Sequence, residues 1–206
     1  MRSRNNLSAR LNVSLFRQNG QTWSDDVMQT CGQKIGTDGC LLTSFAMINR
    51  FFGRTENPGQ VNSIMGNQAC DWYWGTATAR FGFVVHSFRE GSPSGSAISV
   101  DTVRAHIVGA INTGHPVIVL YLDDKGRRHH VVAYAYTGSG SSISVLDPNS
   151  LGGFSNINQI VSAGLPIVRI ITYTHGKATP PPLCDPFGSC FTPWQITLPE
   201  YKQTKE

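Results

Sequence analysis

The chain has no long hydrophobic run: no stretch of its 206 residues reaches the roughly 18 apolar residues that a membrane-spanning helix needs. Charge is also sparse, at 15% Asp, Glu, Lys and Arg, and the basic residues are scattered. No stripe of Lys and Arg with interleaved aromatic residues occurs, so the net charge of +4 does not indicate nucleic-acid binding. These absences leave a globular chain that is long enough to bury a sizeable core.

The cysteines lack the spacing of a metal site. No Cys-x-x-Cys pair occurs, and no Cys/His spacing resembles a zinc site, so we expect no metal and no other cofactor. The odd count leaves at least one thiol free. Two of the five cysteines, Cys184 and Cys190, flank the segment "DPFGS". They either form a disulfide that closes a small loop or pack against their surroundings without one. The five cysteines are Cys31, Cys40, Cys70, Cys184 and Cys190.

The ends of the chain look irregular. The N-terminus carries the arginines of a signal peptide without the apolar segment that should follow them, so we expect a cytoplasmic protein or export by a route other than Sec. Residues 1–22 are interpreted as an irregular arm and residues 23–175 as the globular domain. Residues 176–206 are rich in proline and are interpreted as a tail packed on the surface.

Hydrophobic spacing predicts helices in the first half of the chain and strands in the second. Leu41, Phe45, Ile48 and Phe52 recur at helical spacing and predict a helix that stops at Gly53. The predicted helices are 40–52, 58–65 and 100–112, and the predicted strands are 81–88, 116–122, 129–136, 143–147 and 165–175. Short polar turns join the later strands, which favours an antiparallel meander and an α+β fold.

Cys40 stands at the first turn of the first predicted helix. There the helix dipole and the unpaired backbone N–H groups favour a thiolate and can stabilise an oxyanion beside it. Gly39 removes a side chain where a substrate would approach. The alternative is that Cys40 is a small buried core residue.

His129 begins a predicted strand, and Asp147 ends the next one. Because the start of one antiparallel strand lies beside the end of its neighbour, the two side chains should meet, with the carboxylate orienting the imidazole toward Cys40. Strand alternation is expected to turn His130 to the other face of the sheet. Taken singly, His129 also fits an exposed turn residue, and Asp147 also fits the start of an Asp-Pro turn.

Four motifs in this order resemble the papain-like cysteine peptidases of the bacteriocin-processing branch: "GTDGCLLTSFAMI", "GHPVIVLY", "HHVVAYAY" and "ISVLDPN". The resemblance implies a papain-like fold whose central helix carries the cysteine and packs on an antiparallel sheet. It also implies Cys40 as nucleophile, His129 as base and Asp147 as the orienting residue. The register against Ala135-Tyr136 selects His129 over His130.

The resemblance also implies an oxyanion glutamine a few positions before the cysteine. Lys34 stands there in this chain, so Gln33, one position away, is the candidate. The signature Cys-Gly-Ser-Cys-Trp of papain itself is absent. The aromatic cluster Trp72-Tyr73-Trp74 is either core or the wall of a substrate cleft.

The expected activity is that of a thiol protease, which cleaves an amide bond through a thioester. The substrate would be a protein or a peptide, including a leader peptide or the peptide stem of the cell wall. A bacterial effector, a phage-associated lysin and a processing protease all fit. Two alternatives remain: a deamidase or acyltransferase using the same residues, and an inert papain-like domain used for binding.

Overall fold

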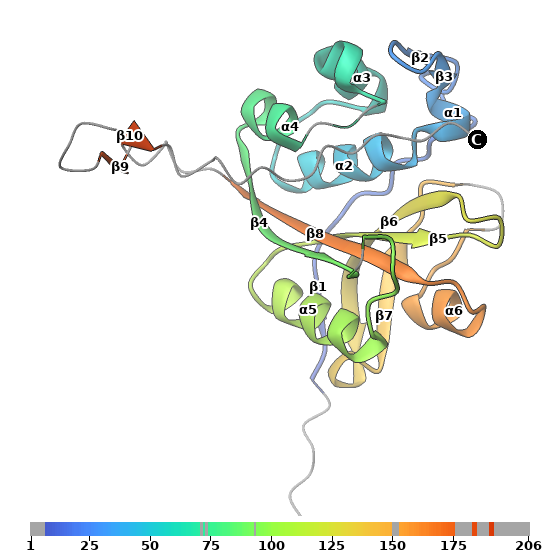
Figure 1. Ribbon diagram of the computed structural model, residues 1–206, viewed down its shortest axis with the longest axis vertical. Coiled ribbons are helices and arrows are strands. Elements are labelled where there is room, and N and C mark those ends of the chain that lie inside the picture. Colours follow the sequence, from blue (N-terminus) through green and yellow to red (C-terminus); the bar gives the residue numbers. More distant parts are fainter. Residues whose placement is uncertain are drawn as a thin grey trace, which may run out of the picture.

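A six-stranded antiparallel sheet separates two groups of helices (Figure 1). The computed structural model describes residues 7–70, 72, 74–92, 94–149 and 153–175, with two short strands at 183–184 and 190–191. The strands of the sheet are β1 (Ala9–Arg10), β4 (Phe83–Glu90), β5 (Val117–Leu122), β6 (Arg128–Thr137), β7 (Ser142–Leu146) and β8 (Ile167–His175). Their order is β1-β6-β5-β8-β4, with β7 on the other edge of β6.

Strands β5, β6 and β7 form the meander that the sequence predicted, and β8 then returns to lie between β5 and β4. Strands β5 and β1 pair with β6 one after the other along the same edge. Strand β5 pairs with β6 as far as Ala133, and beyond it Ala9 of β1 pairs with Tyr136. Part of the interval interpreted as an irregular arm is therefore a strand of the sheet.

Helix α2 (Cys40–Phe51) crosses one face of the sheet, and every residue from Cys40 to Asn49 is buried. A helix that is enclosed on all sides belongs to the core. The ring of Phe45 lies 4.9 Å from that of Trp72 and 5.3 Å from that of Tyr173 on β8. Trp72 is therefore a core residue, whereas the side chains of Tyr73 and Trp74 lie outside the described part of the chain.

The opposite face is covered by α5 (Val100–Asn112) and α6 (Ile157–Ser162), which enclose a second apolar cluster (Figure 1). Alternation along the strands divides the two cores. On β5, Ile118 belongs to the core under α2, while Val117 and Val119 belong to the core under α5. Odd-numbered and even-numbered residues of β5 thus face opposite sides of the sheet.

The predicted helix boundaries are confirmed to within a residue or two. Helix α2 gives way to Gly53 at a φ of +87°, a conformation that glycine adopts without strain. Helix α3 (Pro58–Met65) starts with a capping box between Asn57 and Gln60. The remaining elements are α1 (Ile35–Asp38), η1 (Gly66–Gln68), α4 (Trp74–Phe81), η2 (Gly138–Gly140), β2 (Val27–Met28), β3 (Gln33–Lys34), β9 (Leu183–Cys184) and β10 (Cys190–Phe191).

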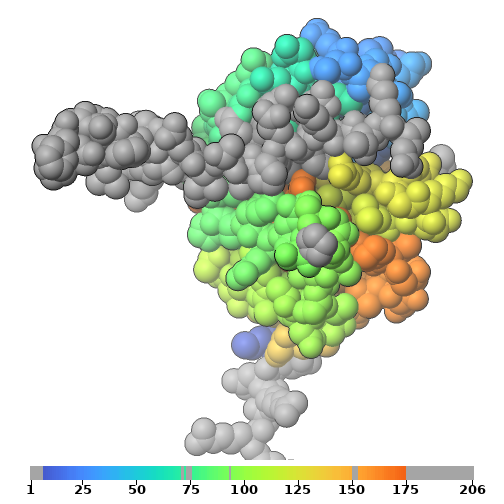
Figure 2. Space-filling model, in the orientation of Figure 1, coloured from blue at the N-terminus to red at the C-terminus, as the bar shows by residue number. Residues whose placement is uncertain are grey.

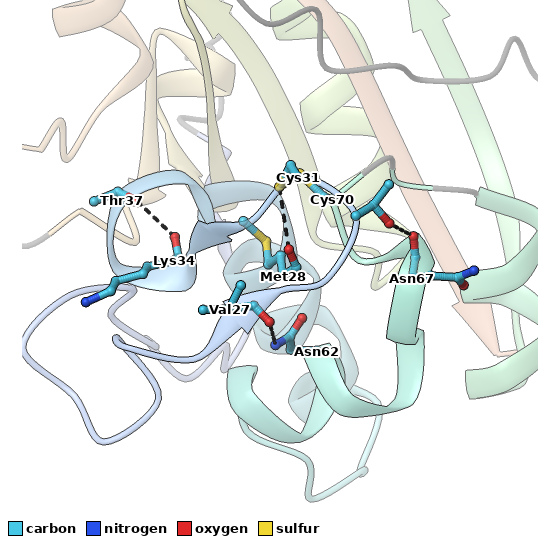
Figure 3. The surroundings of a disulfide bond; sticks show 9 residues. Val27, Met28, Cys31, Lys34, Thr37, Asn62, Asn67 and Cys70 are labelled. Atoms are coloured by element: carbon cyan, nitrogen blue, oxygen red, sulfur yellow. Dashed lines mark hydrogen bonds between the residues drawn. A yellow bond between two sulfur atoms is a disulfide. The ribbon is translucent and has the colours of Figure 1, made fainter.

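A disulfide joins Cys31, in the β2–β3 hairpin, to Cys70, which follows η1 (Figure 3). The same two segments are also joined by a hydrogen bond from the Thr30 hydroxyl to the carbonyl of Asn67. The sequence did not predict this pairing, and the side chains of Cys184 and Cys190 lie outside the described residues. No helix in the described part of the chain is long and apolar enough to cross a membrane.

Candidate active site

Cys40 is the first residue of α2 and is 6% exposed. Its Sγ lies 3.9 Å from the carbonyl oxygen of Arg128, the first residue of β6. The preceding residue, Gly39, provides no side-chain cap for α2, so the positive end of the helix dipole faces the thiol. Of the cysteines whose side chains the structure describes, Cys40 alone is free.

Packing requires a glycine at position 39, in addition to any need for a substrate to approach Cys40. A Cβ added there would lie 2.6 Å from the backbone oxygen of Ile35 and 2.7 Å from its Cγ2. Both distances are far below van der Waals contact, so α1 would have to move away from α2. The close approach of α1 to Gly39 sets the position of the loop that leads into Cys40.

The prediction that His130 faces away from Cys40 is wrong. His130 Nδ1 lies 3.5 Å from Cys40 Sγ, and the residue is 2% exposed. Alternation does send the two side chains to different faces of β6, but the even positions are the ones that face α2, as Val132 in the α2 core shows. Both imidazoles still interact with the sulfur, which lies beside Arg128 at the start of β6. The Ser44 hydroxyl of α2 also donates a hydrogen bond to the backbone oxygen of His130 at 3.2 Å.

His129 and Asp147 meet at the edge of the sheet, with His129 Nε2 2.7 Å from Asp147 Oδ1. The backbone N–H of Asn149 donates to the same oxygen at 2.8 Å, and that of Phe154 donates to Oδ2 at 3.1 Å. Gly153 packs so closely that a Cβ there would lie 2.7 Å from Asp147 Cγ. The carboxylate is therefore held from three sides with one oxygen aimed at the imidazole.

The electrostatics of Cys40 and His129 are those of a thiolate–imidazolium pair. Burial would raise the pKa of Cys40, but hydrogen bonds from His129 and His130 and their charges outweigh burial and lower it to about 5. Burial would lower the pKa of His129, but hydrogen bonds to Asp147 and Cys40 raise it to about 10. His129 therefore interacts with Cys40 as well as with Asp147.

The pKa of His130 moves in the opposite direction. Burial lowers it, and the charges of His129 and Arg169 add to that effect, against the opposing attraction of Cys40. Above the ordinary histidine pKa, the second imidazole is therefore neutral while the first one is still charged. Two adjacent histidines thus face the same sulfur in different protonation states.

Two aromatic residues cover the His129–Asp147 pair. The ring of Tyr121 lies 5.4 Å from that of His129 and 5.7 Å from that of Phe154, both edge-on. Tyr121 is 5% exposed, and burial together with the charges of Asp147 and Cys40 raises the pKa of its hydroxyl. By excluding water, these rings strengthen the hydrogen bond that they cover.

Gln18 is a site residue that the sequence analysis missed. It is 4% exposed, and its Nε2 donates to the carbonyls of Gly36 and Thr37 at 3.2 and 3.3 Å, on the loop that leads into Cys40. Its Oε1 is buried without a hydrogen-bond partner. The hairpin of β2 and β3 lies between Gln18 and Cys40 in the sequence, which is why a search only a few positions before the cysteine did not find it.

Gln33, the candidate proposed from the sequence, lies on strand β3 and is exposed. Its pairing partner is Met28 in the β2–β3 hairpin. An exposed hairpin residue is poorly placed to meet an oxyanion that forms beside the buried sulfur of Cys40. Gln18 is the better placed of the two.

Arg17 ties the Gln18 segment to the turn that carries Asp147. Its Nη1 donates to the backbone oxygen of Asn149 at 2.8 Å, and the backbone N–H of Gln18 donates to that of Pro148 at 2.9 Å. The space-filling view shows the segment that precedes Cys40 (blue) at the top of the molecule and the β5–β6 hairpin (yellow) below it on the same side (Figure 2). One short segment thus contacts both the cysteine loop and the Asp147 turn.

No group of three or more His, Cys, Asp or Glu side chains within the described residues could hold a metal ion. The site itself contains a buried thiol with a lowered pKa, an imidazole with a carboxylate behind it, and a second imidazole.

Comparison with known families identifies one match. The model of the Peptidase_C39 like family matches residues 10–165, a span that includes Gln18, Cys40, both histidines and Asp147. No curated protein matches the chain.

Proposed function

The chain belongs to the C39-like peptidase family, a branch of the papain-like cysteine peptidases, and on that premise we propose that it cleaves amide bonds with a Cys40-His129-Asp147 triad. The observation that carries the proposal is the hydrogen bond of His129 to Asp147 combined with the coupling of His129 to Cys40. His130 also contacts the sulfur, but its pKa is lowered by burial, whereas that of His129 is raised. Those properties suit His129, rather than His130, to proton transfer.

In the proposed reaction, the Cys40 thiolate attacks the carbonyl carbon and forms a C–S bond, and the carbonyl electrons move to the oxygen. The tetrahedral intermediate collapses to a thioester as the C–N bond breaks, and His129 gives its proton to the leaving amine. Neutral His129 then takes a proton from water, which attacks the thioester. Release of the carboxylic acid restores the thiolate and the imidazolium.

We propose Gln18 Nε2 and the backbone N–H of Cys40 as the donors to the oxyanion. The two Nε2 hydrogens point to the carbonyls of Gly36 and Thr37 in the resting site, so one of them would turn to the oxyanion as it forms. The burial of Gln18 and its contact with the loop at Gly36 and Thr37 support this role. Removal of one such donor typically lowers kcat by about 100- to 1,000-fold. Gln18→Ala should show a loss of this size, and Gln33→Ala, on the exposed hairpin, should have full activity.

The nucleophile assignment is tested by alkylation of the full chain. Iodoacetamide at mildly acidic pH should modify Cys40 of the native protein first, because the pKa of Cys40 is lowered to about 5 while Cys31 and Cys70 form a disulfide. Peptide mapping identifies the modified residue, and Cys40→Ala provides the control. Modification of all thiols at one rate would contradict an activated Cys40.

The reaction is tested with protein and peptide substrates, including cell-wall peptide stems, by comparing wild type with Cys40→Ala. Mass spectrometry distinguishes three outcomes of one thioester chemistry: chain cleavage, conversion of an amide side chain to an acid, and a cross-link to an amine. Cleavage supports the peptidase. Deamidation or transfer would identify the chain as a papain-like effector, and binding without turnover would identify it as an inert binding domain.

We also propose that the protein works in an oxidising compartment. The support is the Cys31–Cys70 disulfide, a bond that reducing cytosols do not maintain. Purification from its native source under alkylating conditions should show Cys31 and Cys70 unmodified and Cys40 modified. Alkylated Cys31 and Cys70 would place the protein in a reducing compartment instead.

A further inference from the structure

Cys40 faces a second imidazole that the proposed mechanism does not use. His130 Nδ1 lies 3.5 Å from Cys40 Sγ, within hydrogen-bond range for a sulfur acceptor. Cys40 Sγ is also the atom that attacks the substrate in the proposed triad. The imidazole is 2% exposed, so it cannot exchange this contact for one with water. The contact is therefore a permanent part of the resting site.

The surroundings of His130 hold it in place. Its backbone oxygen accepts a hydrogen bond from Ser44, one turn along α2 from Cys40, and its backbone pairs with Leu120 of β5. The backbone of His130 is thus held by α2 through Ser44 and by β5 through the pairing of the strands. This arrangement fixes Nδ1 against the sulfur without help from a substrate.

A buried imidazole in contact with a thiolate either carries a charge or donates a single N–H. The charged and titratable groups that act on His130 are Cys40 on α2, His129 on β6 and Arg169 on β8. Two of these three are cationic and oppose a second positive charge. A neutral imidazole has one proton, and only the tautomer protonated at Nδ1 can donate it to the sulfur.

We propose that His130 is a second catalytic residue: a neutral imidazole whose Nδ1–H donates a hydrogen bond to the Cys40 thiolate while His129 performs the proton transfers. The inference rests on the proposed triad and extends it. Such a donor stabilises the sulfur when it is negative, before attack and again as it leaves the acyl group. The second donor therefore keeps Cys40 ionised at a lower pH than a single imidazole would. The activity consequently extends to more acidic pH.

The proposal is tested by the pH dependence of Cys40 alkylation in full-length variants. His130→Phe removes the donor and keeps an aromatic ring, whereas His130→Asn keeps an N–H donor close to the position of Nδ1. In His130→Phe, loss of one hydrogen bond to a charged group should shift the acid limb of the alkylation profile to higher pH by about one unit. At a pH below that limb, alkylation is then about tenfold slower than in wild type. The His130→Asn limb should stay near that of wild type.

His115→Phe is the matched control, because His115 stacks on His86 away from the site. Its alkylation profile should equal that of wild type. Equal acid limbs for His130→Phe and wild type, with both proteins folded, would overturn the role of His130 and leave the triad intact. Loss of turnover at every pH in His130→Phe, with turnover retained in His129→Asn, would instead overturn His129 as the base and with it this assignment.

A second measurement uses the wild-type protein and so does not depend on how a variant folds. Nitrogen NMR of histidine-labelled protein should show His130 neutral and protonated at Nδ1 near neutral pH, and His129 protonated at both nitrogens. A His130 ring that is doubly protonated, or protonated only at Nε2, would overturn the proposal.

Discussion

At the scale of single residues, the site depends on the space that glycine leaves. Asp147 accepts hydrogen bonds from His129, Asn149 and Phe154, and it has room to do so because Gly153 packs against it without a side chain. The carboxylate of Asp147 is thus positioned by the absence of a side chain at Gly153 as well as by its hydrogen-bond donors.

Gly153→Ala should therefore lower both activity and stability. The added Cβ would meet Asp147 Cγ at 2.7 Å, so either the carboxylate or the 153–154 backbone must move, at a cost of about 1–3 kcal/mol in unfolding free energy. Peptidase activity and urea denaturation measure the two effects. Gly109→Ala is the control: no atom lies near its added Cβ, and alanine in the exposed middle of α5 should stabilise by about 0.5–1 kcal/mol. A Gly153→Ala variant as active as Gly109→Ala would contradict the packing argument.

The second residue-scale prediction concerns pH. Attack needs the Cys40 thiolate, whose pKa is about 5, so kcat/KM should fall as pH decreases below that value. In the proposed mechanism, release of the amine needs protonated His129, whose pKa is about 10, so kcat/KM should also fall above that value. Rates measured across this range should form a broad plateau between the two limbs. A narrow bell centred near the ordinary histidine pKa would contradict the coupled pair.

At the scale of elements, the segment from Arg17 to Asn19 connects the two halves of the site. On one side Gln18 contacts the loop before α2, and on the other side Arg17 and Asn19 contact Asn149 in the Asp147 turn. The Trp23 indole N–H fixes the segment by donating to the backbone oxygen of Arg17 at 2.8 Å.

Arg17→Ala should lower kcat more than it affects KM. Without the guanidinium, the carbonyl of Asn149 loses this hydrogen bond and the Asp147 turn is held against the Gln18 segment only by the bonds of Gln18 and Asn19. We expect about a tenfold loss in kcat, consistent with one lost hydrogen bond to a charged group. Steady-state kinetics measure this, with Arg10→Ala on β1 as a control that also removes a guanidinium from the N-terminal segment. Equal losses in the two variants would indicate a general effect on the segment.

Long elements could be predicted from the sequence, and short ones could not. Helices α2, α3 and α5 and the longer strands of the sheet, β4 to β8, carry enough apolar residues to be recognised, and the adjacency of His129 and Asp147 followed from strand pairing. The two-residue strands β1, β2 and β3 have no measurable period, so Gln18 was placed in an irregular arm. The prediction for His130 was wrong for a different reason. Alternation shows that neighbouring strand residues face opposite sides of the sheet, but only the packing shows which side α2 covers.

At the scale of the whole molecule, the Cys31–Cys70 disulfide closes a loop that contains Cys40 and all of α2. The bond joins the β2–β3 hairpin to the segment after η1, so it limits the chain on both sides of the helix that carries the nucleophile (Figure 3). In the unfolded chain it restricts the separation of those two segments.

Reduction of this disulfide should lower the free energy of unfolding by about 4 kcal/mol, the value that loop entropy gives for a separation of 39 residues. Thermal unfolding with and without reductant measures the change, and Cys40 is first alkylated so that thiol exchange cannot occur. Cys31→Ala/Cys70→Ala should unfold like the reduced protein in either condition. A double variant as stable as the oxidised wild type would show that the bond contributes nothing.

The hydrogen bond between Arg17 and Asn149 spans 132 positions of the chain, and the contact between Cys40 and His130 spans 90. During synthesis, α2 leaves the ribosome long before β6 exists, so the nascent chain carries Cys40 as an ordinary, weakly reactive thiol. The sulfur gains its reactivity only when the second half of the sheet has been made and the N-terminal segment has closed on the Asp147 turn. The ribosome-bound chain is thereby prevented from attacking itself or its neighbours, and the appearance of a reactive thiol reports that folding is complete.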